Sequence, residues 1–128
     1  QARTVDVTAV FRFFDSDLGR EMRASGELYR EYPFSVLAPA FHFYPEVSEE
    51  ENILLQGVID CWFRGPEGIT LVDFKTDRVT ADTAQERAES YRGQLSAYSY
   101  ALEQVTGEKV VRRILWFLQP NLGVMLPD

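Results

Sequence analysis

Two apolar segments separated by a tight turn constrain the fold of this chain more than any other feature. Segment 54–63 reads Leu-Leu-Gln-Gly-Val-Ile-Asp-Cys-Trp-Phe, segment 69–75 reads Ile-Thr-Leu-Val-Asp-Phe-Lys, and Arg-Gly-Pro-Glu-Gly lies between them. Apolar runs on both sides of a turn rich in Gly and Pro predict a β-hairpin. Because residues two apart in a strand share a face, we expect Asp73 and Lys75 on one side and Phe74 on the other.

The rest of the chain predicts helices packed on an extended sheet. Asp6 and Ser16 are candidate N-caps, and Pro33 indicates a strand that carries a bulge or lies at an edge. Outside the hairpin, the expected elements are helices at 6–14, 16–25 and 84–103, strands at 27–38 and 110–118, an extension of the first strand at 41–44, and a short final edge strand. This order predicts an α/β (α+β) fold, a central mixed sheet flanked by helices, with one helix crossing between strands.

Length and composition indicate a single globular domain at 1–128. The 128 residues are 45% hydrophobic, and they contain neither a membrane-spanning run nor a signal peptide, so the expected compartment is cytoplasmic. The one cysteine, Cys61, excludes an internal disulfide and an iron–sulfur cluster within this chain. The net charge of −7 argues against tight, independent binding of nucleic acid. The chain starts with Gln1 and not Met, so we expect it to be a fragment of a longer polypeptide.

Three charged residues of the hairpin are candidates for metal-dependent chemistry. Two carboxylates on adjacent strands, Asp60 and Asp73, can bind Mg²⁺ through oxygen, and the backbone carbonyl of Phe74 is a candidate third ligand. Lys75 can orient a water or stabilise charge that develops on a phosphate. The alternative interpretation is a salt bridge between Asp60 and Lys75 at the strand end, with Asp73 solvated.

A second candidate group lies on the expected helix at 84–103. Gln94 and Tyr98 are four residues apart and share a helix face, and Tyr91 lies three residues before Gln94. One interpretation places these side chains beside the metal site, where they contact DNA or the lysine. Periodicity alone favours the alternative, in which Tyr98 belongs to the core and Gln94 to the surface.

Taken together, these motifs resemble a known family. Gly57-Val58-Ile59-Asp60, Leu71-Val72-Asp73-Phe74-Lys75-Thr76-Asp77 and Tyr91-x-x-Gln94-Leu95-x-x-Tyr98 are similar to motifs of the RecB-family nuclease domain, within the PD-(D/E)xK superfamily. The similarity is greatest to the C-terminal nuclease domain of AddA-type helicase-nucleases, whose strand before the hairpin resembles Arg30–Phe34. The resemblance implies a restriction-endonuclease-like core.

The resemblance also implies roles for individual residues. Asp60 and Asp73 would be metal ligands, Lys75 the catalytic lysine, and Gln94 and Tyr98 would lie near the DNA. An acid on the preceding strand, Glu31, would be a supporting residue.

The function implied is that of a Mg²⁺-dependent (or Mn²⁺-dependent) DNA exonuclease acting in double-strand-break repair and recombination. Its partners would be DNA, a helicase portion of the same polypeptide and a second, AddB-like subunit. A non-catalytic docking or DNA-guiding module and a phage or CRISPR-type RecB-like exonuclease are the alternatives. The family usually carries a histidine on an upstream helix; we expect this chain to begin after that helix, and we interpret its single histidine, His42, as a sheet residue.

Overall fold

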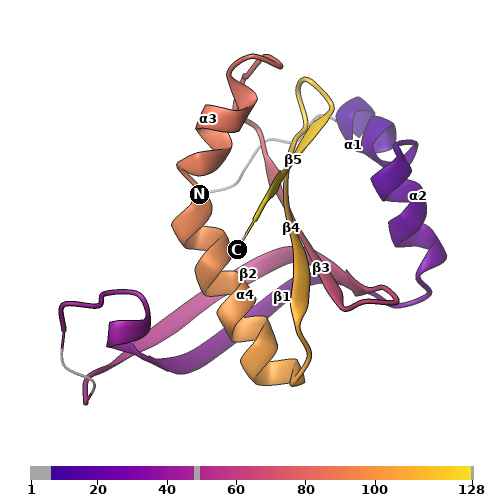
Figure 1. Ribbon diagram of the computed structural model, residues 1–128. Coiled ribbons are helices and arrows are strands. Elements are labelled where there is room, and N and C mark those ends of the chain that lie inside the picture. Colours follow the sequence, from indigo (N-terminus) through magenta and orange to yellow (C-terminus); the bar gives the residue numbers. More distant parts are fainter. Residues whose placement is uncertain (1–6, 48–49, 128) are drawn as a thin grey trace.

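The computed structural model describes residues 7–47 and 50–127, which build one five-stranded sheet with helices on both faces (Figure 1). The helices are α1 (Val7–Phe14), α2 (Asp17–Ala24), α3 (Ala84–Glu89) and α4 (Arg92–Thr106), with a 3₁₀ helix η1 at Ala40–His42. The strands are β1 (Leu28–Pro39), β2 (Asn52–Arg64), β3 (Ile69–Lys75), β4 (Val110–Phe117) and β5 (Leu122–Leu126). No helix in these two ranges is both long and apolar enough to cross a membrane.

The sheet is mixed, and its strand order follows the chain from β1 to β5. All neighbouring strands are antiparallel except β3 and β4, which are parallel and connected through α3 and α4. Helices α1 and α2 cover one face, and α3 and α4 cover the other (Figure 1). The structure therefore confirms the expected α/β mixed sheet with a helical crossover between strands.

Most predicted elements are confirmed within a few residues, and two are wrong. Ser16 caps α2 by accepting a hydrogen bond from the Gly19 N–H at 3.1 Å, whereas the Asp6 cap lies outside the described residues. The helix expected at 84–103 is two helices, because Tyr91 has φ −102° and ψ 4° and breaks the helical path between them. The strand extension expected at 41–44 is wrong, because the chain turns through η1 there before it returns as β2.

The core has two layers that lie on opposite faces of the sheet. Beneath α1 and α2, Phe13 packs edge-on against Phe74 and Trp116 with 4.9 Å between ring centroids in both pairs. Cys61 is buried in this layer. Beneath α3 and α4, the buried apolar residues include Trp62 and the helix residue Leu95. Phe74 thus lies on the α1 side of β3. Its neighbours Asp73 and Lys75 therefore lie on the α4 side.

The β1–β2 ladder changes face at one position. Ile59 and Trp62 both belong to the layer under α4 although they are an odd number of residues apart, so side-chain alternation along β2 is interrupted between them. Glu31 has φ 48° at this point. It lies opposite Asp60, between the paired positions Arg30–Cys61 and Tyr32–Ile59, but the two residues are not themselves a ladder pair. The edge position predicted from Pro33 is confirmed, but this pairing contains no register shift that would mark a bulge.

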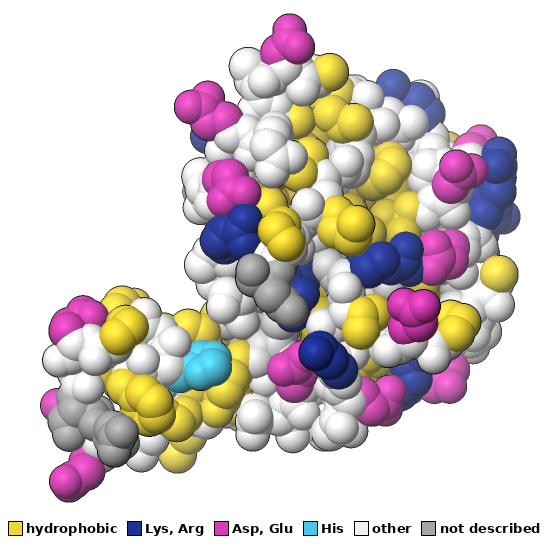
Figure 2. All heavy atoms as spheres, viewed as in Figure 1, with side chains coloured by type: hydrophobic (Ala, Val, Ile, Leu, Met, Phe, Trp, Pro, Cys, Tyr) yellow, Lys and Arg dark blue, Asp and Glu magenta, His cyan; other side chains and the backbone are white. Residues whose placement is uncertain are grey.

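Past this point β1 and β2 form a two-stranded arm. Pairing of β2 with β3 covers only residues 61–64 and 69–72, so the earlier part of β2 extends away from the body of the sheet (Figure 1). The arm ends in η1, and it projects in Figure 2 as a lobe with hydrophobic side chains and the histidine on its surface. Leu37 and Leu54 are cross-strand partners on its outer face and are more than half exposed.

Candidate catalytic site

Two carboxylates meet where the ladder between β2 and β3 ends. The last pair of this ladder joins Cys61 to Val72, and the next position in the same register brings Asp60 opposite Asp73. The paired positions stop at Cys61, and Asp60 Oδ2 accepts a hydrogen bond from the Phe74 N–H at 2.8 Å. The strand end therefore holds two acidic side chains side by side.

Burial and a second negative charge alter the protonation of Asp73. This residue is only 3% exposed, and burial is the main cause that raises its pKa to about 6, from an ordinary value near 3.8. The Lys75 ammonium opposes this shift, whereas the Asp60 carboxylate increases it by repulsion and by favouring a hydrogen bond to the protonated form. Two carboxylates and one ammonium leave the group with a formal charge of −1.

Lys75 connects the carboxylates to α4. Its Nζ lies 2.8 Å from Asp73 Oδ2 and donates a hydrogen bond of 2.8 Å to Gln94 Oε1. In the alternative interpretation Asp73 is solvated; this is wrong, because Asp73 is buried and is itself an ion-pair partner of Lys75. The side chain of Lys75 is only 13% exposed, so a normally flexible ammonium is held in one place.

The motif on α4 continues this chain of contacts. Gln94 Nε2 donates to the Tyr98 hydroxyl at 3.0 Å, so both ends of the Gln94 amide are engaged. Tyr98 is half-buried and packs edge-on against Phe34 at 5.5 Å, and a Cβ at Gly57 would lie 3.1 Å from the Phe34 ring and 3.4 Å from Tyr98. Gln94 contacts the lysine directly and Tyr98 contacts Gln94, as the first interpretation expects. The alternative also agrees with the structure, because Gln94 is exposed and Tyr98 packs against the core.

Tyr91 and Asp77 lie on the other side of the lysine. Lys75 Nζ lies 4.1 Å from the centroid of the Tyr91 ring, within the range of a cation–π interaction. The Tyr91 hydroxyl donates to both Asp77 oxygens, at 2.9 and 3.1 Å, and Arg87 lies 3.6 Å from the same carboxylate. Sequence reasoning assigned no role to Asp77, although its position two residues after Lys75 could have drawn attention to it.

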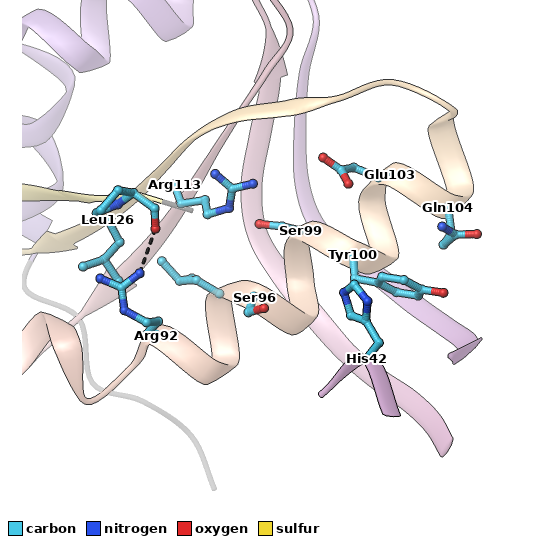
Figure 3. A pocket seen from close by; sticks show the side chains of 11 residues that line it. His42, Arg92, Ser96, Ser99, Tyr100, Glu103, Gln104, Arg113 and Leu126 are labelled. Carbon is cyan, nitrogen blue, oxygen red and sulfur yellow. Dashed lines mark hydrogen bonds between the residues drawn. The ribbon is translucent and has the colours of Figure 1, made fainter. Parts of the chain in front are cut away.

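Glu31 and His42 are not brought together with these carboxylates. Glu31 is exposed on the edge strand, and within residues 7–47 and 50–127 no three His, Cys, Asp or Glu side chains cluster as a metal site. His42 lies in η1 and not in the sheet, because the chain reverses there, and its ring lies 4.9 Å from that of Tyr100. It lines a cavity of about 440 Å³ on another flank of α4, together with Arg92 and Ser99 (Figure 3).

The donor atoms at the strand end fit a hard divalent cation. Asp73 Oδ2 is buried and has the Lys75 ammonium as its ion-pair partner, and among the described residues no well-directed hydrogen bond reaches it. Because the N–H and C=O of one strand residue point to the same side, the Phe74 carbonyl faces the β2 side, where its N–H meets Asp60. Two carboxylates and a carbonyl are a sparse ligand set, which suits Mg²⁺ because this ion keeps several waters and uses substrate phosphate as a ligand.

A mixed sheet with flanking helices, an acidic strand end and a largely buried lysine that α4 contacts is consistent with an α/β nuclease fold. The chain belongs to the PD-(D/E)XK nuclease superfamily, whose model matches residues 4–125.

Curated relatives of this chain are named as subunits of an ATP-dependent helicase/nuclease. The proteins from Acetivibrio thermocellus and Carboxydothermus hydrogenoformans are each 41% identical to it, over 120 and 115 residues, which is 91% and 89% of this chain. The protein from Ruminiclostridium cellulolyticum is 38% identical over 120 residues, or 91% of the chain. The chain spans about a tenth of the length of each of these relatives.

Proposed function

We propose that this chain is the nuclease domain, over residues 1–128, of a longer helicase-nuclease polypeptide, and that it hydrolyses DNA phosphodiesters with a divalent cation. The observation that carries the proposal is the contact of two carboxylates, Asp60 and Asp73, beside a fixed Lys75. Membership of the nuclease superfamily and the names of the relatives support the same reaction class.

The charges of the site support a cation and a phosphodiester as its ligands. Asp60, Asp73 and Lys75 sum to −1, so a bound dication brings the site to +1, which matches the single negative charge of a phosphodiester. When bound, Mg²⁺ or Mn²⁺ supplies charge neutralisation at the phosphate and activation of the attacking water. We assign Asp60, Asp73 and the Phe74 carbonyl to the cation.

The remaining residues hold the reacting groups in place. Lys75 donates to a phosphate oxygen or to the attacking water, and its two short contacts, to Asp73 and Gln94, fix where that proton donor stands. Gln94 and Tyr98 orient Lys75 and face the DNA. We assign Glu31 only a supporting role at the kink of β1 that faces Asp60.

The wider context proposed for the chain follows from its relatives and from its charge. A helicase portion of the same polypeptide would deliver DNA. Together with an AddB-like subunit, it would supply most of the contacts with the DNA backbone, because this chain has a net charge of −7. We propose that the whole protein acts as an exonuclease in double-strand-break repair and recombination.

Loss of one ligand tests the catalytic assignment. In the full-length polypeptide with Mg²⁺ or Mn²⁺, Asp73→Ala is expected to abolish DNA degradation, as is Lys75→Ala. The matched control is Lys109→Ala, because Lys75 and Lys109 are the two lysines of the chain and Lys109 follows α4 at a distance from the site. DNA degradation that persists in Asp73→Ala would refute the ligand assignment.

Direct metal binding separates the nuclease from a non-catalytic docking module. Titration of Mn²⁺ followed by calorimetry is expected to show binding that Asp60→Asn removes and that Glu67→Gln, in the turn at the opposite end of the hairpin, leaves unchanged. Absence of binding at millimolar Mn²⁺ would favour the docking module.

A further inference from the structure

Asp77 has no role in the chemistry proposed above, although only one residue separates it from Lys75 in the sequence. It follows β3, and its side chain is only 19% exposed. Both of its oxygens accept from the single hydroxyl of Tyr91, at 2.9 and 3.1 Å. A hydrogen bond to a charged carboxylate is stronger than one between neutral groups, so this contact fixes the far end of the Tyr91 ring.

The Tyr91 side chain packs against the apolar layer under α4, but its backbone lies outside a regular helix. Tyr91 stands at the junction between α3 and α4, with dihedral angles outside the helical range. Its backbone carbonyl accepts the Leu95 N–H at 3.1 Å, which starts α4, but its side chain projects from a break and not from a regular turn. The bond to Asp77 ties this break to the segment that leaves β3.

The face of the same ring supports the lysine. Lys75 Nζ stands 4.1 Å from the ring centroid, and it also contacts Asp73 and Gln94. A lysine side chain has four rotatable bonds. Each contact that already restricts the ammonium therefore reduces the conformational entropy that the side chain loses when it takes up its catalytic position. The contacts thus run in one line from Asp77 through the Tyr91 ring to the Lys75 ammonium.

We propose that Asp77 is a positioning residue for Lys75 and that it acts through the ring of Tyr91. The kinetic consequence rests on the proposed nuclease function, whereas the placement of the ammonium over the ring does not. The competing account is that Asp77 only pairs with Arg87 and stabilises the loop before α3, in which case its removal leaves Lys75 where it is.

Nuclear magnetic resonance of lysine side chains tests the placement without any activity measurement. The chain contains only two lysines, so selective ¹³C-lysine labelling gives one Cε–Hε signal for Lys75 and one for the internal reference, Lys109. The current of the Tyr91 ring is expected to shift the Lys75 Hε signal upfield of the Lys109 signal. Tyr91→Leu, which removes the ring, gives the unshifted position.

Two variants then remove the hydroxyl–carboxylate bond but keep the ring. Asp77→Ala, which leaves no acceptor for the Tyr91 hydroxyl, and Tyr91→Phe are each expected to move the Lys75 Hε signal toward its unshifted position. The matched control is Tyr29→Phe, because Tyr29 also donates to a carboxylate, Glu27 at 3.1 Å, and lies by β2 at the end that pairs with the start of β3. This control is expected to leave the Lys75 signal unchanged.

Steady-state kinetics of the full-length polypeptide adds the functional measurement. We expect Asp77→Ala to lower kcat on the order of tenfold with little change in KM, the pattern of a misplaced catalytic group. The double variant with Tyr91→Phe is expected to be no slower than either single variant, because both changes break one bond. Arg87→Gln tests the competing account, and it is expected to leave both the Lys75 signal and kcat near wild type.

The possible results are distinct. An unshifted Lys75 signal in the wild-type chain, or a shifted signal that Asp77→Ala and Tyr91→Phe both leave in place, overturns the inference. A signal that moves as expected while no variant, wild type included, cleaves DNA supports the placement and refutes the proposed function instead. Thermal unfolding of each variant shows whether it is folded, and Tyr91→Phe alone tests the inference if Asp77→Ala does not fold.

Discussion

The raised pKa of Asp73 makes the stability of the metal-free chain depend on pH in a specific direction. Because the folded state holds the proton of this carboxyl more tightly than the unfolded state, the contribution is fully present below the unfolded pKa. It is lost as pH rises through the folded pKa of about 6. The difference from the ordinary value near 3.8 corresponds to about 3 kcal/mol in total, of which about 2 kcal/mol is lost between pH 4 and pH 8.

Other titrating groups also contribute to that pH dependence, so a matched variant is needed. Asp73→Asn keeps the shape of the side chain but cannot titrate. The difference in the free energy of unfolding between the variant and the wild type, measured by urea denaturation in EDTA, is expected to shift by about 2 kcal/mol in favour of the variant from pH 4 to pH 8. A difference that stays constant from pH 4 to pH 8 would show that the folded state does not raise the pKa of Asp73.

Addition of a cation should reverse the effect. At pH 8, Mn²⁺ at one hundred times its dissociation constant is expected to raise the free energy of unfolding of the wild type by about 2.7 kcal/mol. The same addition is expected to leave Asp73→Asn unchanged, because the variant lacks one of the two carboxylates. Equal stabilisation of both proteins would place the cation elsewhere.

Three further predictions concern the core, a helix cap and the buried thiol. Phe13→Ala is expected to lower the free energy of unfolding by about 3–5 kcal/mol. Phe11→Ala, at a residue 65% exposed on the same helix, is expected to change it by less than about 0.5 kcal/mol. Equal effects in urea denaturation would contradict the burial of the Phe13 face of α1. Ser16→Ala is expected to cost about 1 kcal/mol in the same assay, through loss of the α2 cap. Burial raises the pKa of the Cys61 thiol, so a thiol reagent at pH 8 is expected to react only after unfolding, and rapid stoichiometric reaction of the native chain would contradict this.

The hairpin and the orientation of its charged residues could be predicted from sequence because both depend on local rules. The alternation of side chains along a strand needs only the next few residues, so Asp73, Lys75 and Phe74 could be assigned to their faces directly. The same is true of the Ser16 cap, whose partner lies three residues away. In each of these cases the residues that interact are close together in the sequence.

Features that depend on distant partners could not be predicted in this way. The change of face at Glu31 and Asp60 involves a non-glycine residue with positive φ, and no glycine or turn signal marks it. The break before α4 is hidden because apolar spacing continues through it, while the Asp77 partner of Tyr91 lies 14 residues away. The ion pair between Asp73 and Lys75 likewise depends on how three strands and a helix assemble.

The interrupted ladder and the strained carboxylate have one physical origin. A regular strand pair would satisfy the Phe74 N–H with a backbone carbonyl, but β2 leaves the ladder at Asp60, so a side-chain carboxylate takes that N–H instead. The same departure brings a second negative charge against the buried Asp73, which destabilises the metal-free fold above pH 6. A dication that relieves this repulsion recovers the lost free energy as binding affinity, so a site with only two carboxylates can favour the cation. Asp60→Asn, which keeps an acceptor for the Phe74 N–H but removes the repulsion, is therefore expected to stabilise the metal-free chain and to weaken Mn²⁺ binding in the same protein. A variant that binds Mn²⁺ less tightly without any gain in metal-free stability would show that the two properties are unrelated.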